Sequence, residues 1–339
     1  MDISKPQIKI SFITGLKEIV LHEISQYKNL HILKAVDDFV YLDFVTDFTE
    51  IVSLRSISCA YVIIQNFHYN PSYISNHKSI LGTLIETIVH KNKFKTFKII
   101  CAGSDSPEVH NISTYIQKTY GLIEKDEADM KIHIIKNDGL WEIGIQITPR
   151  PLSLRDYKIE NMSGAMDPTI AYAVNSLCQL ENADTYLNIF SGSATLLIEA
   201  AQCYPDLKKL VGFDNNKKHI SLAIQNIRKS GQIKRIQLNE EDIFTKPDLG
   251  KFDVITSDLP FGMSISKNEN LENVYKEFID YCEDILKKDG VMCVYTSEHA
   301  ILKRIINKSN FIILKTVELK FITSIHAYLR PKIFVCKFK

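Results

Sequence analysis

The chain has 339 residues, of which 45% are hydrophobic and 24% charged, and its formal net charge is +1 at pH 7. One hydrophobic core stops growing near roughly 250–300 residues, so two or three domains are expected. The 13 glycines and 10 prolines are too few for a collagen-like or largely disordered chain, and no apolar run approaches the roughly 20 residues that span a bilayer. The N-terminus has no signal-peptide pattern, so a soluble cytoplasmic protein is expected.

Residues 1–67 predict the order strand, helix, strand, strand, helix, strand, which is typical of a ferredoxin-like unit. Residues 68–150 predict a second small α/β unit, and the alternative is that both halves form one α+β domain. The first half has strands near 7–13, 35–44 and 61–67 and helices near 16–26 and 48–56. The second has helices at 79–90 and 109–120 and strands at 97–102, 130–136 and 141–148.

Residues 148–157 contain two prolines and three charged residues and predict an extended connector, which we place at 151–164. Strands and helices then alternate over residues 165–339, which predicts a Rossmann-like, doubly wound and mostly parallel sheet. The fold class is therefore α/β. The last two strands have no helix between them and are expected to pair antiparallel at one edge. The predicted strands are 185–189, 209–213, 235–239, 254–257, 291–296, 311–319 and 332–337; the predicted helices are 195–203, 217–230, 271–287 and 298–307.

In a doubly wound sheet the ligand binds outside the carboxyl ends of the strands, and four loops there carry candidate residues. In the first, Ser191 and Gly192 precede a helix, and Gly192 lets the backbone approach a ligand closely. Asp214 ends the next strand, 22 residues after Gly192, where a carboxylate can accept both hydroxyls of an adenosine ribose. Asp242 follows the third strand and is expected to accept from an adenine amino group. Each aspartate, taken singly, also fits a turn or a helix cap.

These three loops fit a NAD dehydrogenase and an S-adenosylmethionine methyltransferase equally well. Two observations separate the readings: residues 188–196 lack the Gly-x-Gly-x-x-Gly pattern, and the fourth loop has an unusual content. That loop is Asp258, Leu259, Pro260 and Phe261 at the end of a buried strand. Such a loop is unexpected for hydride transfer and suits methylation of an exocyclic amine on a base.

The segment Asp-Leu-Pro-Phe at 258–261 resembles the (D/N)-P-P-(Y/F) signature of amino-methyltransferases. With the following glycine, it is similar to variants found in RNA guanine-N2 methyltransferases that carry a THUMP domain. Residues 150–155 and 164–171 resemble the joint before their catalytic domain, and residues 12–19 resemble their N-terminal opening. The resemblance to this THUMP-containing tRNA guanine-N2 methyltransferase family covers nearly the whole chain. Within the family, the chain resembles the tRNA enzymes that form N2-methylguanosine at position 6.

The resemblance implies four parts: a ferredoxin-like domain (1–67), a THUMP RNA-binding domain (68–150), the connector (151–164) and a Rossmann-fold methyltransferase domain (165–339). It implies S-adenosyl-L-methionine as cofactor. The implied partner is tRNA, gripped at its 3′ end and methylated in the acceptor stem. A monomer without membrane association is expected.

The residues expected to bind the cofactor are Asn188, Ser191, Gly192, Ala194, Thr195, Asp214, Asn215, Asp242, Ile243 and Asp258. Two of them depart from the family's pattern, because Asn188 stands where aspartate is usual and Ala194 where a second glycine is usual. Either change is expected to weaken cofactor binding. The scattered cysteines form no Cys-x-x-Cys pair, and no metal site is predicted.

A nearly neutral chain that binds RNA must use local basic patches. One candidate, interleaved with two phenylalanines, comprises Lys91, Lys93, Lys95 and Lys98. A solvated strand edge with two core aromatics is the structural alternative, and the resemblance favours phosphate contacts. Arg150 and Arg155 in the connector are further RNA candidates, with interdomain ion pairs as the alternative.

The Watson–Crick edge of guanine offers two donors, N1–H and the N2 amine, and a carboxylate complements that edge. We therefore expect Asp258, helped by the Leu259 carbonyl, to accept from the N2 amine. Pro260 fixes the turn and Phe261 stacks on the base. The alternatives are a 23S rRNA guanine-N2 methyltransferase, a catalytically degenerate RNA-binding protein of the same fold, and a small-molecule methyltransferase with an unrelated α+β appendage.

Overall fold

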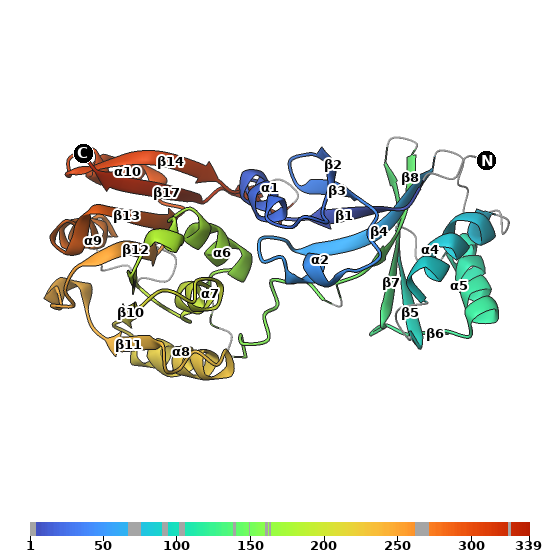
Figure 1. The fold of residues 1–339 in the computed structure, drawn as a ribbon, viewed down its shortest axis with the longest axis horizontal. Coiled ribbons are helices and arrows are strands. Elements are labelled where there is room, and N and C mark those ends of the chain that lie inside the picture. Colours follow the sequence, from blue (N-terminus) through green and yellow to red (C-terminus); the bar gives the residue numbers. More distant parts are fainter. Residues whose placement is uncertain are drawn as a thin grey trace. The chain divides into compact units, whose positions relative to one another are not determined.

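The computed structural model describes residues 5–66, 76–89, 94–101, 106–137, 140–148, 150–159, 162, 164–261, 271–324 and 327–339. The chain divides into two compact units, which Figure 1 shows with their helices and strands labelled. Unit 1 comprises Met1–Phe12 and Val20–Leu152, and unit 2 comprises Ile13–Ile19 and Ser153–Lys339. Within the described ranges, no helix is both long enough and apolar enough to cross a membrane.

The N-terminal elements follow the predicted order over the first half. They are β1 (Gln7–Ser11), α1 (Lys17–Ser25), β2 (Ile32–Ala35), β3 (Phe39–Asp43), α2 (Thr49–Ser53), β4 (Cys59–Asn66), the π-helical turn η1 (His77–Leu81), α4 (Gly82–Val89), β5 (Thr96–Cys101), α5 (Pro107–Tyr120), β6 (Ile123–Glu124), β7 (Met130–Asn137) and β8 (Leu140–Gln146). Local signals set the ends of α5: the Ser106 side chain accepts from the backbone of Val109, and Gly121 ends the helix at φ 67°.

All eight strands of unit 1 belong to one sheet, in the order β2-β3-β1-β4-β8-β7-β5-β6. The antiparallel β4–β8 ladder, from Tyr61 opposite Gln146 to Asn66 opposite Trp141, joins the two predicted α+β units. This continuity favours the alternative that both halves share one fold. The expected domain boundary at residue 67 lies outside the described residues and stays a prediction.

Unit 2 has the predicted alternation of strands and helices. Its elements are α6 (Pro168–Ser176), the 3₁₀ turn η2 (Leu180–Asn182), β9 (Thr185–Ile189), α7 (Thr195–Cys203), β10 (Lys209–Asp214), α8 (Lys217–Lys229), β11 (Ile236–Glu240), the 3₁₀ turn η3 (Ile243–Thr245), β12 (Phe252–Asp258), α9 (Leu271–Ile285), β13 (Leu286–Thr296), α10 (His299–Ile306), β14 (Phe311–Glu318), β15 (Phe321–Ser324), β16 (Ala327–Leu329) and β17 (Lys332–Phe338).

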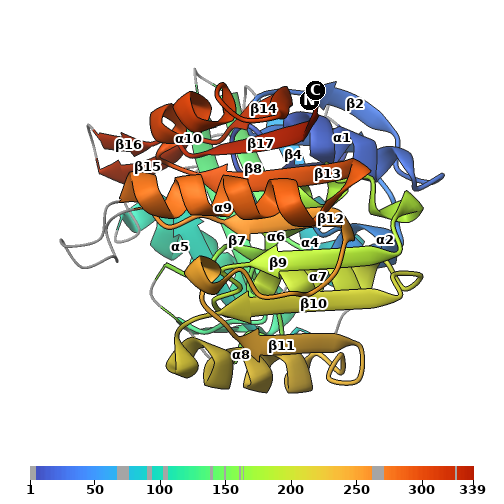
Figure 2. The ribbon, with the colours of Figure 1, turned by 90° about the vertical axis from the view of Figure 1, so that its left-hand side faces the viewer.

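The sheet of unit 2 has the strand order β11-β10-β9-β12-β13-β17-β14, which Figure 2 shows from bottom to top. The first five strands are parallel, and β17 is antiparallel to both of its neighbours. The Rossmann-like doubly wound fold is therefore confirmed. The last two long strands pair antiparallel as predicted, with β17 inserted next to β13 so that β14 forms the edge. The strand order reverses between β9 and β12, where such sheets bind their ligands.

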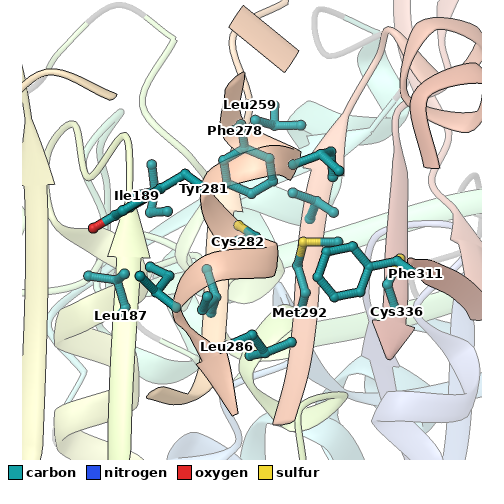
Figure 3. Packing of buried hydrophobic residues seen from close by; sticks show 14 of the residues in the cluster. Leu187, Ile189, Leu259, Phe278, Tyr281, Cys282, Leu286, Met292, Phe311 and Cys336 are labelled. Carbon is teal, nitrogen blue, oxygen red and sulfur yellow. The ribbon is translucent and has the colours of Figure 1, made fainter. Parts of the chain in front are cut away.

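Helix α9 supplies much of the core beside β12 and β13. Phe278, Cys282 and Tyr281 of this helix are at most 1% exposed, and they pack with residues such as Leu187 and Met292 of the sheet (Figure 3). Burial of large apolar side chains contributes about 1.5–3 kcal/mol each, before the entropy of ordering is subtracted. This packing fixes the carboxyl ends of β9 and β12, where the candidate site residues lie.

Candidate active site

A cavity of about 750 Å³ opens at the carboxyl ends of β9, β10, β11 and β12. All four predicted loops contribute to its wall. Of the predicted residues, those that line it are Ser191, Gly192, Thr195, Asp214, Asn215, Asp242, Ile243, Asp258, Leu259, Pro260 and Phe261. The strand-end argument therefore brought together residues that are up to 70 positions apart in the chain.

The turn after β9 holds three left-handed backbone conformations in five residues. Phe190 has φ 57°, Gly192 has φ 50° and Ala194 has φ 62°. A left-handed conformation costs a residue with a Cβ about 1–2 kcal/mol, so Phe190 and Ala194 hold backbone strain here. A Cβ on Gly192 would lie 2.9 Å from Cε of Met162, so glycine keeps the cavity wall open at this point.

Asp214 is 7% exposed and ties the first two loops together. Its Oδ2 accepts from the backbone N–H of Gly192 (2.9 Å), and its Oδ1 accepts from the backbone N–H of Asn216 (3.0 Å). The Nδ1 of His219 lies 3.2 Å from Oδ1. A carboxylate has about four lone-pair directions, so Asp214 keeps capacity to accept from ligand hydroxyls at the cavity wall.

Asp242 caps a helical turn, as the structural alternative expected, and also lines the cavity, so its expected contact with adenine stays a prediction. Its Oδ1 accepts from the backbone N–H of Phe244 (2.9 Å), which caps η3, and its Oδ2 accepts from the amide of Asn215 (3.4 Å). Phe244 also lines the cavity and leaves 49% of its surface exposed. A large apolar side chain at a cavity mouth is suited to cover the flat face of a ring.

The turn at Asp258–Phe261 follows the buried strand β12. The backbone N–H of Leu259 donates to the carbonyl of Tyr295 on β13 (3.0 Å), and the Leu259 side chain is 1% exposed. The ring of Phe261 lies 5.5 Å from that of Tyr295, centroid to centroid, at an interplanar angle of 54°. The turn is thus held from the β13 side, while Asp258, Pro260 and Phe261 face the cavity.

Burial raises the pKa of the Asp258 carboxyl from 3.8 to about 7. No residue in the described part of the chain donates a hydrogen bond or a positive charge to its carboxylate. An unpaired carboxyl group in a cavity is a candidate functional group, because a bound ligand can supply the missing partner. A group that titrates near pH 7 can both accept and release a proton.

A directed chain of hydrogen bonds ends on the same turn. The Tyr275 hydroxyl donates to the Pro260 carbonyl (2.8 Å), which is an acceptor only. Thr296 Oγ1 lies 2.6 Å from that hydroxyl and must therefore donate to it, and the backbone N–H of Glu298 donates to Thr296 Oγ1 (2.9 Å). Burial raises the pKa of Tyr275, so this hydroxyl remains a donor across the physiological range.

Asn188 and Ala194 were expected to touch the cofactor, and neither lines the cavity. Asn188 is 1% exposed within β9, and its amide donates to the Thr256 carbonyl of the neighbouring strand (3.2 Å). Its Oδ1 is buried with no hydrogen-bond partner among the described residues. Ala194 is fully buried under the turn before α7.

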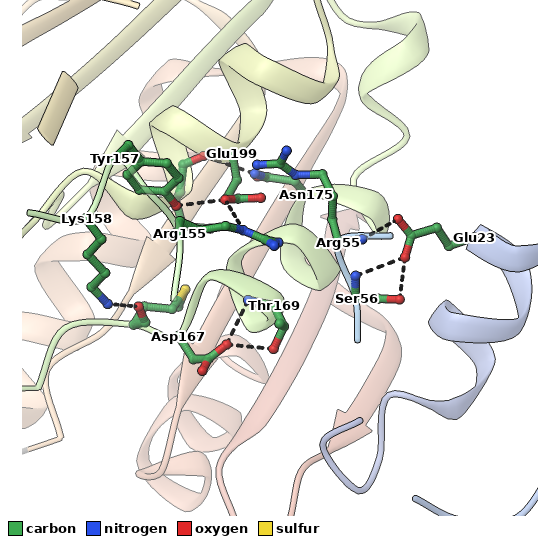
Figure 4. A network of polar contacts seen from close by, with 12 residues as sticks. Glu23, Arg55, Ser56, Arg155, Tyr157, Lys158, Asp167, Thr169, Asn175 and Glu199 are labelled. Carbon is green, nitrogen blue, oxygen red and sulfur yellow. Dashed lines mark hydrogen bonds and ion pairs between the residues drawn. The ribbon is translucent and has the colours of Figure 1, made fainter. Parts of the chain in front are cut away.

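The connector is fastened to unit 2 by the polar network in Figure 4. Arg155 Nε (3.2 Å) and the Tyr157 hydroxyl (2.7 Å) both donate to Oε1 of Glu199, which is fully buried on α7. Lys158 donates to the carbonyl of Met166 (2.9 Å), a cavity residue. The expected RNA contact by Arg155 is not supported, because its side chain is 11% exposed in an ion pair within its own unit.

The structure describes some of the other residues that are expected to contact RNA. Lys91 and Lys93 lie outside the described residues. Lys95 is exposed, and Lys98 donates to Asp126 (3.0 Å) in an exposed ion pair. Arg150 is exposed. Within the described ranges, no three histidine, cysteine, aspartate or glutamate side chains are grouped to hold a metal ion.

Sequence reasoning missed part of the cavity wall. The missed lining residues are Met162, Gly164, Ala165, Met166, Phe190, Ser193, Leu196, Asn216, His219, Phe244, Val274 and Leu329. One sequence pattern could have identified the connector residues of this wall, namely the helix start at residues 167–169. Asp167 caps α6 by accepting from the backbone N–H of Thr169, and Pro168 occupies the first turn. That pattern marks a helix directly after residues 162–166 and so brings them to its N-terminal end. Leu329 had no comparable signal.

Comparisons with known proteins agree with this geometry. The RMKL-like methyltransferase domain family matches residues 155–324. The mouse U6 snRNA (guanine-N(2))-methyltransferase THUMPD2 is 27% identical over 171 residues, which are 50% of this chain and 31% of that protein. The tRNA (guanine(6)-N2)-methyltransferase of Thermus thermophilus is 26% identical over 202 residues, 59% of this chain and 60% of that one. The chain thus spans less than a third of the first relative's length and less than two thirds of the second's.

Solved structures share the fold over the whole chain. TrmN from Thermus thermophilus superposes with a TM-score of 0.79 at 20% identity, covering 99% of this chain and 100% of that one. SMU.472, a putative methyltransferase complexed with SAH, gives a TM-score of 0.75 at 14% identity, covering 99% of both chains. The strand order, the cavity at the strand ends and a match over half of the chain lead to one conclusion. This chain belongs to the RMKL-like methyltransferase domain family.

Proposed function

We propose that this protein transfers a methyl group from S-adenosyl-L-methionine to the N2 atom of a guanosine in tRNA. The observation that carries the proposal is that Asp258, which has no hydrogen-bond or charged partner among the described residues, lines one cavity with Pro260, Phe261 and the aspartates of two other strand ends. The relatives named for guanine-N2 methylation support the choice of base. The resemblance at residues 258–261 points to the same base.

The cavity residues fit the cofactor. Asp214 presents a carboxylate for ribose hydroxyls, and Asp242 presents one for an adenine amino group, with Phe244 available to cover the ring. The open backbone at Gly192 leaves room near the helix α7 N-terminus. A volume of about 750 Å³ is within the usual range for a ligand pocket. When bound, the cofactor supplies an electrophilic methyl group on a positively charged sulfur.

Asp258 performs the central role in this mechanism. Its ionised carboxylate accepts a hydrogen bond from the N2 amine and orients the nitrogen lone pair towards the methyl group. The bound cofactor would supply the methyl group and retain the electron pair of the bond that it loses, while N2 would lose a proton. The N2 proton passes to Asp258, whose pKa of about 7 suits a group that must accept and later release it. Positioning and charge complementarity supply the catalysis.

Phe261 and Pro260 define where the base lies. A guanine that leaves its stack needs a compensating surface, and stacking on an aromatic ring is worth roughly 1–3 kcal/mol. The contact of the Phe261 ring with Tyr295 supports that role. The Leu259 and Pro260 carbonyls belong to the same rigid turn, so the acceptors near the amine are fixed before the base arrives.

We assign the finer points by resemblance. The substrate is a nucleotide of the tRNA acceptor stem, position 6 in the family's numbering, and unit 1 grips the 3′ end. The protein acts as a monomer in the cytoplasm. The departures at Asn188 and Ala194 gave a binding-only protein its support, and the fact that neither residue lines the cavity weakens that alternative.

The test is incubation of the purified protein with unmodified total tRNA and labelled S-adenosylmethionine, followed by nucleoside mass spectrometry. N2-methylguanosine is the expected product. Asp258→Ala should lower turnover by several orders of magnitude and leave tRNA affinity unchanged. Asp253→Asn is the matched control, because Asp253 lies at the amino end of the same strand, bonded to Thr185 and Lys287. Methylation of rRNA or snRNA in place of tRNA would change the substrate, and absence of any transfer would refute the proposal.

A further inference from the structure

The hairpin β15–β16 is an insertion between two paired strands. Strands β14 and β17 form an antiparallel ladder that ends where Glu318 pairs with Lys332, and Lys332 also pairs with Thr296 of β13. Because Thr296 is the carboxyl end of β13, strands β15 and β16 extend from the end of the sheet at which the cavity lies. Figure 2 shows the hairpin beyond the ends of β14 and β17.

One hairpin residue reaches the cavity and its neighbours face solvent. Leu329 lines the cavity together with Asp258 and Phe261. Ile322 is 77% exposed and Tyr328, its partner across the hairpin, is 48% exposed. A two-stranded hairpin alone is only marginally stable. Apolar side chains that stay exposed on such a hairpin do not stabilise its fold and are typical of a binding surface. The hairpin presents such a surface beside the site.

Two cations flank the exposed tyrosine. Lys320 Nζ lies 4.3 Å from the centre of the Tyr328 ring, and the guanidinium carbon of Arg330 lies 6.0 Å from it. Glu318 is the acidic group beside them; it bonds Lys332 (2.7 Å) more closely than Arg330 (3.4 Å). The described residues of this small surface therefore carry an excess of positive charge around an aromatic ring.

We propose that this hairpin is an RNA-binding element of the catalytic unit. Tyr328 stacks on a nucleobase next to the guanosine that enters the cavity, and Lys320 and Arg330 contact the neighbouring phosphates. Aromatic rings with adjacent cations suit unstacked RNA, where bases stack on rings and phosphates take the charge. Leu329 continues this surface to the cavity mouth. The inference rests on the proposed function and names a second contact of the same site with its substrate.

The experiment measures binding of the full chain to an unmodified tRNA transcript by fluorescence anisotropy, without cofactor, over a range of salt concentrations. Tyr328→Ala should weaken tRNA binding about tenfold or more, and Tyr328→Phe, which keeps the ring, should restore it. Lys320→Ala should weaken binding and lower the slope of log affinity against log salt by about one. Affinity for S-adenosylmethionine should not change in any of these variants.

Two variants at the opposite edge of the sheet serve as controls. Lys208→Ala removes an exposed cation paired with Asp184 just before β10, and Ile233→Ala removes an apolar side chain that is 45% exposed before β11. Neither should alter tRNA binding. If the wild type methylates tRNA and Tyr328→Ala and Lys320→Ala bind it normally, the hairpin proposal is wrong and the proposed function stands. If the wild type neither binds nor methylates RNA, both are wrong.

Discussion

Asp258 combines burial, contact with the cavity and a carboxylate that has no partner in the described part of the chain, and the proposed function therefore depends on the ionisation of this one residue. Only the ionised form can accept from the guanine amine without presenting a proton of its own. Burial shifts the pKa to about 7, so a substantial fraction of the free protein is protonated at neutral pH. The positive sulfur of a bound cofactor would favour ionisation and lower this pKa in the complex.

The first prediction is therefore a pH profile. We expect kcat/KM to rise about tenfold per pH unit below 7 and to level off above it, because that parameter reports the free enzyme. The profile of kcat, measured at saturating cofactor and RNA, should be shifted to lower pH. Initial rates of methyl transfer to a tRNA transcript between pH 5 and 9 provide the measurement. A flat kcat/KM profile would show that Asp258 does not titrate in the step that limits it.

The same pKa has an independent consequence for stability. Between pH 3.8 and 7 the folded chain keeps a proton on Asp258 that the unfolded chain has released. The contribution of Asp258 to the free energy of unfolding therefore falls as the pH rises through this range and is constant above pH 7. Asp258→Asn removes the loss of stability that comes from ionising this buried carboxyl group. Its thermal midpoint relative to the wild type should increase from pH 4 to pH 7 and then level off, which separates a shifted pKa from an unrelated pH effect on the RNA.

For single residues, the sequence predicts the lining of the cavity best at positions directly at or after the carboxyl end of a strand. Asp214, Asp242 and Asp258 were found because parallel strands bring their carboxyl ends to one edge. Asn188 and Ala194 do not line the cavity, and their assignment to the cofactor stays a prediction, because a motif fixes a position in the chain without fixing the direction of the side chain. In the structure Asn188 bonds sideways to β12, and Ala194 lies buried beneath the turn.

At the scale of elements, alternation of apolar segments predicted every long strand of unit 2 and its parallel order. Strand β17 was expected only as the partner of β14, because pairing order within a sheet depends on tertiary packing that local periodicity does not contain. The hairpin β15–β16 has strands of four and three residues, too short for a period of two to be visible. Helix α6 was missed although its Asp-Pro-Thr start carries a capping signal.

Helix α9 yields a third prediction, since its Tyr275 holds the turn at Asp258–Phe261. Tyr275→Phe keeps the buried ring and removes the donor to the Pro260 carbonyl, which leaves the turn less restrained. We expect kcat to fall about tenfold or more while the affinity for S-adenosylmethionine changes little, because positioning errors cost turnover before binding. Steady-state kinetics with tRNA, together with calorimetric titration of the cofactor, test this.

The same helix provides a matched control. Tyr281, six residues later, donates its hydroxyl to the Pro247 carbonyl (2.6 Å) and is 1% exposed, so Tyr281→Phe removes a similar bond away from the turn. Both variants should lose about 0.5–1.5 kcal/mol of stability, the usual net value of a hydrogen bond. Equal kcat values for the two variants would reduce Tyr275 to a packing residue. Thr296→Ser, which keeps the donor to Tyr275, should behave as the wild type.

At the scale of the whole molecule, the chain has two compact units and a net charge of only +1. Strong RNA binding cannot come from a general positive field, so it must be assembled from separate local contacts. Two weak contacts joined in one chain act as a bivalent binder, because binding at one raises the effective concentration at the other. Our proposal assigns the 3′ end of tRNA to unit 1 and the methylated guanosine to unit 2.

The last prediction follows from this division. A tRNA transcript that lacks its single-stranded 3′ end should keep its kcat and raise the KM for RNA by about tenfold or more, because the cavity in unit 2 is unchanged while the second contact is lost. Adding the hairpin variant Tyr328→Ala to the truncated transcript should raise KM further, since the two changes remove separate contacts.

A transcript shortened by the same number of nucleotides in the anticodon arm is the control and should behave as the intact one. Equal KM values for intact and 3′-truncated tRNA would show that unit 1 does not grip the 3′ end, and would leave the catalytic unit as the part that selects the substrate.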